Sequence, residues 1–257
     1  MNKVKNFWDS QAQEYRDNYQ ATNPDFYSFV KEIEILKEYL KENLEVLEYG
    51  CGNGYASRQL FKETAYRDYL GIDYSTEMIA SARIAYVAER STTDFCTTSV
   101  KYEVGNVKTH QPSKKFDVVV TDRCLINLET HEEQMEAVKN IHSNLKAKGC
   151  YLMIECSKKS LVNINEIRTQ YGLDQIAERW HNCYLEEDRF LKEIYPYFSV
   201  EKIDCFASTY FLISRTINAL ADSGPINYLS RINELASQLP ALGDYAPLKL
   251  FVLKKRG

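Results

Sequence analysis

Three glycines stand at alternate positions after an acidic residue in residues 48–54, which read Glu-Tyr-Gly-Cys-Gly-Asn-Gly. Without side chains, such a loop can turn sharply and approach a ligand closely. A loop that binds a dinucleotide would instead show the spacing G-x-G-x-x-G, with the pyrophosphate at a helix N-terminus. The acidic residue would repel a pyrophosphate, but it suits a cationic or amino-bearing ligand. We therefore favour a ligand site over an ordinary tight turn.

A second acidic residue, Asp73, ends the next apolar run, residues 69–73. An acid at the end of such a strand can accept hydrogen bonds from both hydroxyls of a ribose in an open α/β sheet. Taken alone, Asp73 is better explained as a solvated residue at a strand end. Together with the glycine loop, it indicates a ligand that contains a ribose.

The elements that must position these residues alternate along the chain. We expect strands at residues 44–48, 69–73, 100–104, 116–121 and 151–155. Helical spacing separates them at residues 25–41, 55–62, 75–90 and 132–145, where Ser75 is a plausible N-cap and the last helix ends near Gly149. Such alternation predicts a parallel sheet covered by helices on both faces.

The rhythm changes after residue 155. Residues 156–180 show no strand character, and a helix is expected at residues 185–195. Two further strands are expected at residues 200–206 and 249–253. Helical spacing at residues 211–220 and 226–239 separates them by far more than a hairpin connection.

The composition excludes several classes of protein. The net charge is −4, from 32 basic and 36 acidic residues, and no basic block indicates a nucleic-acid partner. The apolar runs are too short to cross a bilayer and no signal peptide is recognisable, so we expect a cytoplasmic protein with no membrane partner. The seven cysteines are scattered without a CxxC pair, which disfavours disulfides and a metal site.

In order and spacing, five stretches resemble the motifs of class I S-adenosylmethionine-dependent methyltransferases: residues 46–54, 71–78, 105–107, 116–122 and 145–155. The resemblance covers residues 40–156. It implies a single α/β domain over residues 1–257 with a Rossmann-like, seven-stranded sheet. The last strand of that sheet would be antiparallel and inserted between the fifth and sixth. It also implies S-adenosyl-L-methionine as cofactor and S-adenosyl-L-homocysteine as product.

The resemblance also implies which residues border the cofactor. Glu48 and the glycines would lie at its methionine end, Asp73 would hold the ribose, and Tyr74 and Met78 would flank the adenine. Asn106 stands where the family often has Asp, and its amide oxygen can accept the same hydrogen bond. The implied set is Tyr15, Glu48, Gly50, Gly52, Gly54, Asp73, Tyr74, Met78, Asn106, Val107 and Thr121.

Ligands of open α/β sheets bind beyond the carboxyl ends of the strands, where both long insertions begin. We expect the N-terminal helical segment 1–40 and the insertions 156–195 and 207–246 to enclose a pocket for a small molecule. His181 is our candidate general base, with Arg123 and Asn127 beside the transferred methyl group. The candidate substrate-binding residues are Trp180, Tyr184, Tyr210 and Arg215.

The acceptor is interpreted from general likeness to bacterial methyltransferases of surface-glycan and secondary-metabolite pathways. That likeness favours O-methylation of a sugar, a sugar nucleotide or a phosphorylated metabolite, as in capsule or polysaccharide biosynthesis. N-methylation of a small amine is the alternative, and it would need no strong base. A non-catalytic S-adenosylmethionine-binding regulator and a nicotinamide-dependent oxidoreductase are the alternatives from other classes. The oligomeric state stays open.

Overall fold

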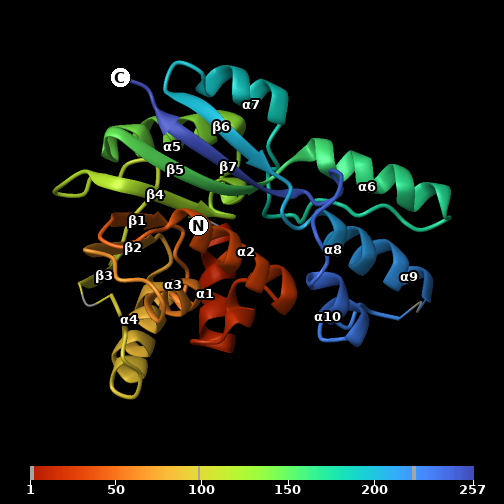
Figure 1. Cartoon of the computed structure of the whole chain (residues 1–257), viewed down its shortest axis with the longest axis horizontal. Coiled ribbons are helices and arrows are strands. Elements are labelled where there is room, and N and C mark those ends of the chain that lie inside the picture. The colour runs from red at the N-terminus through yellow and green to blue at the C-terminus, as the bar shows by residue number, and fades with distance from the viewer. Residues whose placement is uncertain (1–2, 98, 222–223) are drawn as a thin grey trace.

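A computed structural model of the chain describes residues 3–97, 99–221 and 224–257. Its centre is a seven-stranded sheet in the order β3-β2-β1-β4-β5-β7-β6 (Figure 1). β7 runs antiparallel to both of its neighbours, whereas β1 to β5 pair in parallel. The expectation of a Rossmann-like sheet with an inserted antiparallel last strand is confirmed.

The first part of the chain alternates strands and helices as the sequence predicts. The strands are β1 (Glu45–Tyr49), β2 (Asp68–Asp73), β3 (Val100–Val104) and β4 (Phe116–Asp122). The helices that precede or connect them are α1 (Lys3–Tyr15), η1 (Tyr19–Ala21), α2 (Phe26–Tyr39), α3 (Tyr55–Phe61) and α4 (Thr76–Arg90). The side chain of Ser75 caps α4 by accepting a hydrogen bond from the backbone nitrogen of Met78 at 3.0 Å, as a serine at this position should.

The second part carries the insertions. Its elements are η2 (Leu125–Asn127), α5 (His131–Asn144), β5 (Leu145–Cys156), α6 (Lys158–Gln170), α7 (Glu187–Ile194), β6 (Phe198–Asp204), α8 (Ser208–Leu212), η3 (Ile213–Ile217), α9 (Asn218–Ala221), α10 (Arg231–Ser237) and β7 (Leu248–Lys255). Figure 1 shows α6, α8, α9 and α10 gathered at one end of the sheet. Residues 1–2 and 222–223 of the expected segments 1–40 and 207–246 lie outside the described residues.

Alternating residues of each central strand feed two apolar cores. On β5, Leu152 and Ile154 belong to the core beneath α2, α3 and α4. Tyr151 and Met153 point to the other core, which α5 and α7 cover. Both faces of the sheet are therefore buried, and the cavity described below lies at the carboxyl ends of the parallel strands.

The structure differs from the sequence-based expectation at three boundaries. Helix α5 ends at Asn144 instead of near Gly149, because Leu145 already pairs with Phe116 and β5 begins there. Residues 158–170 form helix α6, which the sequence pattern does not predict. The helical stretch 211–220 is interrupted by η3, a π-helix. Of the cysteines, Cys51 and Cys156 are buried and Cys96 is exposed. Among the described residues, no helix is long and apolar enough to cross a membrane.

Candidate functional site

A single cavity of about 350 Å³ gathers most of the residues singled out by sequence. We call one part of it the cofactor half, which is lined by Gly50, Gly52, Asp73, Tyr74, Met78, Asn106 and Val107. The other part, the acceptor half, is lined by Asn23, Asp25, Ser28, Glu32, Asp122, Arg123, His181, Tyr184, Phe211 and Arg215. The N-terminal segment, the β4 loop and both insertions thus meet around one space.

The glycine loop forms the floor of the cofactor half. Gly50 and Gly52 have φ angles of 77° and 54°, which disfavour any residue with a side chain. A Cβ atom at Gly50 would lie 2.7 Å from the Cβ of Cys124, and one at Gly52 would lie 2.8 Å from Thr22 Cγ2. The backbone angles and the close packing therefore require glycine at both positions, and both glycines line the cavity.

Asp73 lies at the end of β2 and fixes the same loop. Its carboxylate accepts hydrogen bonds from the backbone nitrogens of Gly52 at 2.9 Å and Ser75 at 2.8 Å. Burial raises the pKa of Asp73 above its ordinary value, and the backbone donors oppose that shift. The residue lines the cavity and keeps acceptor capacity for further donors, as the binding of ribose hydroxyls requires.

The remaining members of the expected cofactor set are placed in two ways. Tyr74, Met78, Asn106 and Val107 line the cavity, and the side-chain oxygen of Asn106 also accepts a hydrogen bond from the backbone nitrogen of Lys108. The members that do not line the cavity are Tyr15, Glu48, Gly54 and Thr121. Tyr15 packs against a small apolar cluster, and Thr121 is buried against the Tyr151 hydroxyl at 2.8 Å.

Glu48 is buried beneath the glycine loop and hydrogen-bonded to the hydroxyl of Tyr69. Burial raises its pKa from 4.5 to about 7. The protonated form is therefore the one that the folded protein favours. The contribution of this preference to the free energy of unfolding is complete at pH values below the ordinary pKa of Glu48. It is lost as pH rises through the raised pKa that Glu48 has in the folded protein.

We accordingly expect Glu48→Gln to gain stability relative to the natural protein as pH rises from 4.5 to about 7. The amide stays neutral, whereas the carboxyl must ionise in a buried place. Urea unfolding at the two ends of this pH window measures the difference. A difference in unfolding free energy that does not change with pH would contradict the assignment.

The loop after β4 projects Arg123 and Asn127 into the acceptor half. Arg123 has a φ of 50°, and Glu155 holds the loop behind it. The Glu155 carboxylate accepts hydrogen bonds from three successive backbone nitrogens, including that of Leu125 at 2.8 Å. Asn127 accepts a hydrogen bond from the indole nitrogen of Trp8 at 3.2 Å and so connects this loop to α1. An unfavourable backbone angle held in place in this way is typical of functional sites.

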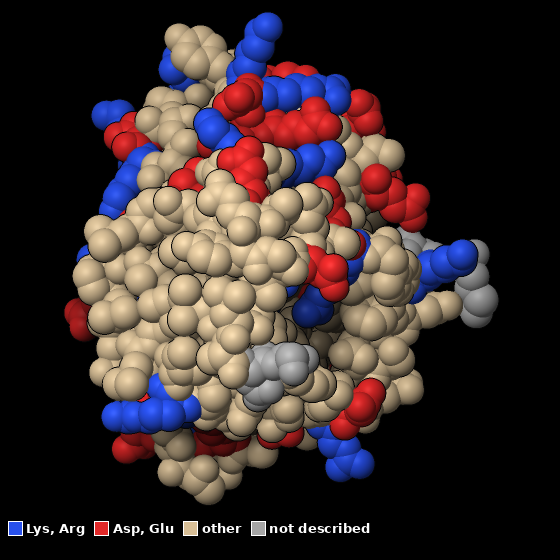
Figure 2. Space-filling view, turned by 90° about the vertical axis from the view of Figure 1, so that its right-hand side faces the viewer, with Lys and Arg blue, Asp and Glu red and all other residues tan. Residues whose placement is uncertain are grey.

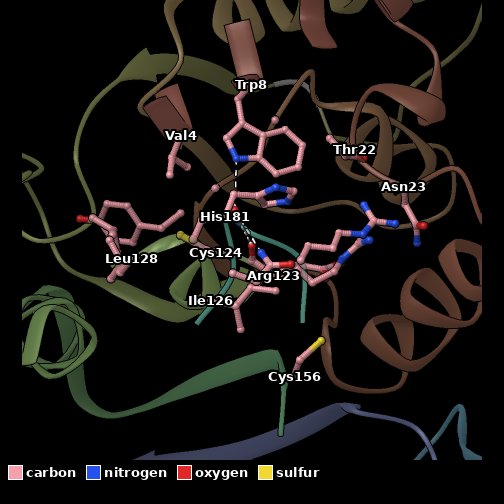
Figure 3. Close-up of a pocket in the computed structure, with 18 of the residues that line it drawn as sticks. Val4, Trp8, Thr22, Asn23, Arg123, Cys124, Ile126, Leu128, Cys156 and His181 are labelled. Carbon is pink, nitrogen blue, oxygen red and sulfur yellow. Dashed lines mark hydrogen bonds and ion pairs between the residues drawn. The ribbon is translucent and has the colours of Figure 1, made fainter. Parts of the chain in front are cut away.

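Helix α2 supplies the acidic wall of the acceptor half, which sequence reasoning missed. The carboxylate of Glu32 is buried and accepts hydrogen bonds from Asn23 at 3.2 Å, Ser28 at 3.0 Å and Arg123 at 2.6 Å. The sequence feature that could have indicated this role is the position of Glu32 on the apolar stripe of the helix, three residues after Phe29. Figure 3 shows Arg123 extending toward Asn23 along this wall.

The second insertion contributes Arg215 through the π-helix η3, a form that often marks functional sites. Its guanidinium lies between the rings of Phe211 and Tyr228, at 4.8 and 4.7 Å from their centroids. It also binds Asp25 at 2.5 Å, and the buried Tyr210 hydroxyl binds the same carboxylate at 2.5 Å. Arg215 lines the cavity, whereas Tyr210 does not.

His181 comes from the first insertion and is packed among aromatic rings. It stacks on Phe7 at 4.5 Å between centroids, and Trp8 meets it edge-on at 5.5 Å (Figure 3). Burial lowers its pKa from 6.5 to about 4, so the imidazole is neutral near pH 7, and its Nδ1 has no hydrogen-bond partner. Tyr184 also lines the cavity, whereas Trp180 is 65% exposed beside it.

A family model described as a methyltransferase domain matches residues 40–194. The chain is 24% identical over 187 residues to the mouse eEF1A lysine and N-terminal methyltransferase. That alignment covers 72% of this chain but only 26% of the mouse protein, so the chain spans about a quarter of its relative's length.

Solved structures share the fold. A TehB-like S-adenosylmethionine-dependent methyltransferase from Corynebacterium glutamicum superposes with a TM-score of 0.58 at 17% identity, covering 97% of this chain and 98% of that one. The N-methyltransferase NodS from Bradyrhizobium japonicum, in complex with S-adenosyl-l-homocysteine, gives 0.55 at 14% identity, covering 98% and 100%. At these identities the likeness concerns the fold alone.

Proposed function

The chain belongs to the methyltransferase domain family, takes its methyl group from S-adenosylmethionine and releases S-adenosylhomocysteine, and on that premise we propose that it methylates a hydroxyl group of a small polar molecule. The residues of the cofactor half would hold the methyl donor, whose sulfonium supplies the electrophilic methyl group. The residues of the acceptor half would bind and orient the hydroxyl. Positioning of this kind is worth up to roughly 7–11 kcal/mol of a transfer barrier.

The pairing of charges in the acceptor half carries this proposal. Arg123 is bound by the carboxylates of Glu32 and Asp122, at 2.6 and 3.2 Å, and Arg215 by Asp25. Because each arginine is already paired, a strongly anionic acceptor finds little net positive charge there. The side chains of the acceptor half instead offer hydrogen-bond donors and acceptors close to one another. Such an arrangement suits a polyhydroxylated molecule such as a sugar.

The surface around the insertions agrees with an uncharged acceptor. Figure 2 shows the face on which α6 and α8 to α10 lie: charged side chains gather along its upper and lower margins, and uncharged residues cover its middle. The surface is hollowed there, and a basic side chain lies in the hollow. We propose a sugar of a bacterial glycan pathway as the acceptor class, and a sugar nucleotide or a phosphorylated metabolite second.

One observation favours an amine as the second candidate. The acceptor half contains three carboxyl side chains, those of Asp25, Glu32 and Asp122. An ionised carboxylate among them would attract a protonated amine, although methyl transfer needs the neutral lone pair. The mouse relative acts on lysine and on an N-terminus, and its amine acceptors belong to the same chemical class.

Transfer of a labelled methyl group from S-adenosylmethionine tests the proposal. The panel of acceptors comprises a neutral sugar, a sugar nucleotide, a sugar phosphate and a primary amine. Label on a hydroxyl would support the proposal, and label on the amine alone would replace it with the second candidate. Binding of S-adenosylhomocysteine without transfer to any acceptor would favour a non-catalytic regulator.

His181 is proposed to accept, through its neutral imidazole, a hydrogen bond from a hydroxyl of the acceptor other than the one that is methylated. We expect His181→Ala to lower kcat/KM for hydroxyl acceptors by roughly 10-fold, the value of one hydrogen bond, and to leave amine acceptors nearly unchanged. His142→Ala is the matched control, because His142 lies on α5 and does not line the cavity. Equal losses in both variants would count against a role for His181.

A further inference from the structure

Two carboxyl groups meet inside the acceptor half, from elements that are far apart in the sequence. Asp122 is the last residue of β4, and Glu32 lies on α2. Arg123 donates a hydrogen bond to each of them, through Nε to Asp122 at 3.2 Å and through a terminal nitrogen to Glu32 at 2.6 Å. Two carboxyls gathered on one guanidinium repel each other when both are ionised, which favours a proton on one of them.

The surroundings decide which member keeps the proton. Glu32 is 1% exposed, and burial raises its pKa well above the ordinary value despite Arg123. Asp122 is 10% exposed and also lines the cavity. The other titratable groups that act on Asp122 are Glu48 on β1, Glu155 on β5 and Cys124 in the following loop. Glu32 therefore favours its protonated form, and Asp122 is the member of the pair with access to a ligand.

We propose that Asp122 is the proton acceptor of the transfer reaction and that Glu32 is its positioning residue. The inference rests on the proposed hydroxyl acceptor. The hydroxyl oxygen forms a bond to the methyl carbon, the carbon–sulfur bond breaks, and its electron pair remains on sulfur. The hydroxyl proton passes to Asp122, so the positive charge of the donor and the negative charge of the carboxyl pair disappear together.

Position and charge favour Asp122 over His181 for this step. A carboxylate stabilises the positive charge that develops on the attacking hydroxyl oxygen as the methyl group is transferred, whereas the neutral imidazole carries no opposite charge. The carboxyl end of β4 also borders the glycine loop, because β1 and β4 are paired neighbours as far as Tyr49 and Thr121. The unpartnered Nδ1 of His181 in the same cavity leaves a second group that a polar acceptor can satisfy.

Asp122→Asn and Glu32→Gln test the proposal, and Glu34→Gln is the matched control on the exposed side of α2. We expect Asp122→Asn to lower kcat for the hydroxyl acceptors of the panel by about 100-fold while S-adenosylhomocysteine binding stays within about threefold, as for loss of a general base. Glu32→Gln should raise KM and lower kcat much less than Asp122→Asn does, because it disturbs the placing of Arg123 and Asp122 and leaves the proton acceptor in place.

Infrared spectroscopy gives a readout that does not depend on the acceptor. With S-adenosylhomocysteine bound at about pH 7, Glu32→Gln should show weaker protonated-carboxyl absorption than the natural protein and Glu34→Gln, and the absorption that remains belongs to other buried carboxyls such as Glu48. Hydroxyl transfer that survives in Asp122→Asn at the natural rate would overturn the proposal while the proposed function stands. Transfer to amines alone would remove the proposed function. Equal protonated-carboxyl absorption in the natural protein and in Glu32→Gln would overturn the role given to Glu32 even where no member of the panel is methylated.

Discussion

Replacing Gly50 by alanine is expected to abolish measurable binding of S-adenosylhomocysteine and to destabilise the fold. A side chain at a φ of 77° costs about 1–2 kcal/mol. The new Cβ would also lie 2.7 Å from Cys124 Cβ, and such overpacking costs about 1–3 kcal/mol more. Relief of that clash must move the β4 loop or the glycine loop, and both line the cavity.

Gly172→Ala is the matched control for this experiment. Its φ of 70° imposes the same backbone cost, but nothing lies within 4 Å of the added Cβ. Urea unfolding and isothermal titration of the two variants separate the effect of the backbone angle from the effect of the clash with Cys124. The double variant Gly50→Ala with Cys124→Gly should regain the stability that the clash with Cys124 removes. It should not regain the stability that the unfavourable backbone angle removes. Natural affinity in Gly50→Ala would show that the glycine loop does not hold the cofactor.

Replacing Asp73 by alanine is expected to weaken S-adenosylhomocysteine binding by about 100-fold, or 2.7 kcal/mol, because hydrogen bonds to a charged group are each worth about 1.5–3 kcal/mol. The variant would lose the proposed bonds to the ribose and would release the backbone nitrogen of Gly52 from its acceptor at 2.9 Å.

Asp68→Asn controls for the loss of an acid on the same strand. Asp68 lies at the other end of β2 and pairs with Lys114 at the surface, where ion pairs contribute little. Isothermal titration should give the natural affinity for Asp68→Asn. If Asp73→Ala also binds as tightly as the natural protein, the ribose is held elsewhere and the assignment of Asp73 fails.

The sequence predicted most of the fold because its strands are short apolar runs between glycines and caps. Ser75 and the run before Gly50 are local signals, and the structure places them as expected. Helix α6 was missed because its side chains include many polar residues and its burial depends on contacts with distant segments. The end of α5 was misjudged because the pairing of Leu145 with Phe116, which starts β5, is a tertiary contact that no local pattern records.

The candidate site was predicted unevenly for the same reason. Gly50, Asp73 and Arg123 stand in motifs next to strand ends, so spacing alone points to them. Asp25 and Glu32 belong to a helix whose role depends on docking against β4 and the second insertion. Nothing in residues 25–41 by themselves indicates Arg123 or Arg215 as partners. An acidic residue on the apolar stripe of a helix was the sequence feature that could have indicated this part of the site, because such a residue needs a buried partner from another segment.

The place of β7 in the sheet has a consequence for synthesis of the chain. β6 pairs with β7, and β7 is the last strand of this sheet to be synthesised. Strands β1 to β5 can pair while translation proceeds, but β5 keeps one open edge until residues 248–255 appear. During that interval the nascent chain exposes an unpaired apolar strand, the situation that invites aggregation. Completion of the sheet therefore depends on β7. Binding of chaperones to the nascent chain should be greatest just before β7 leaves the ribosome.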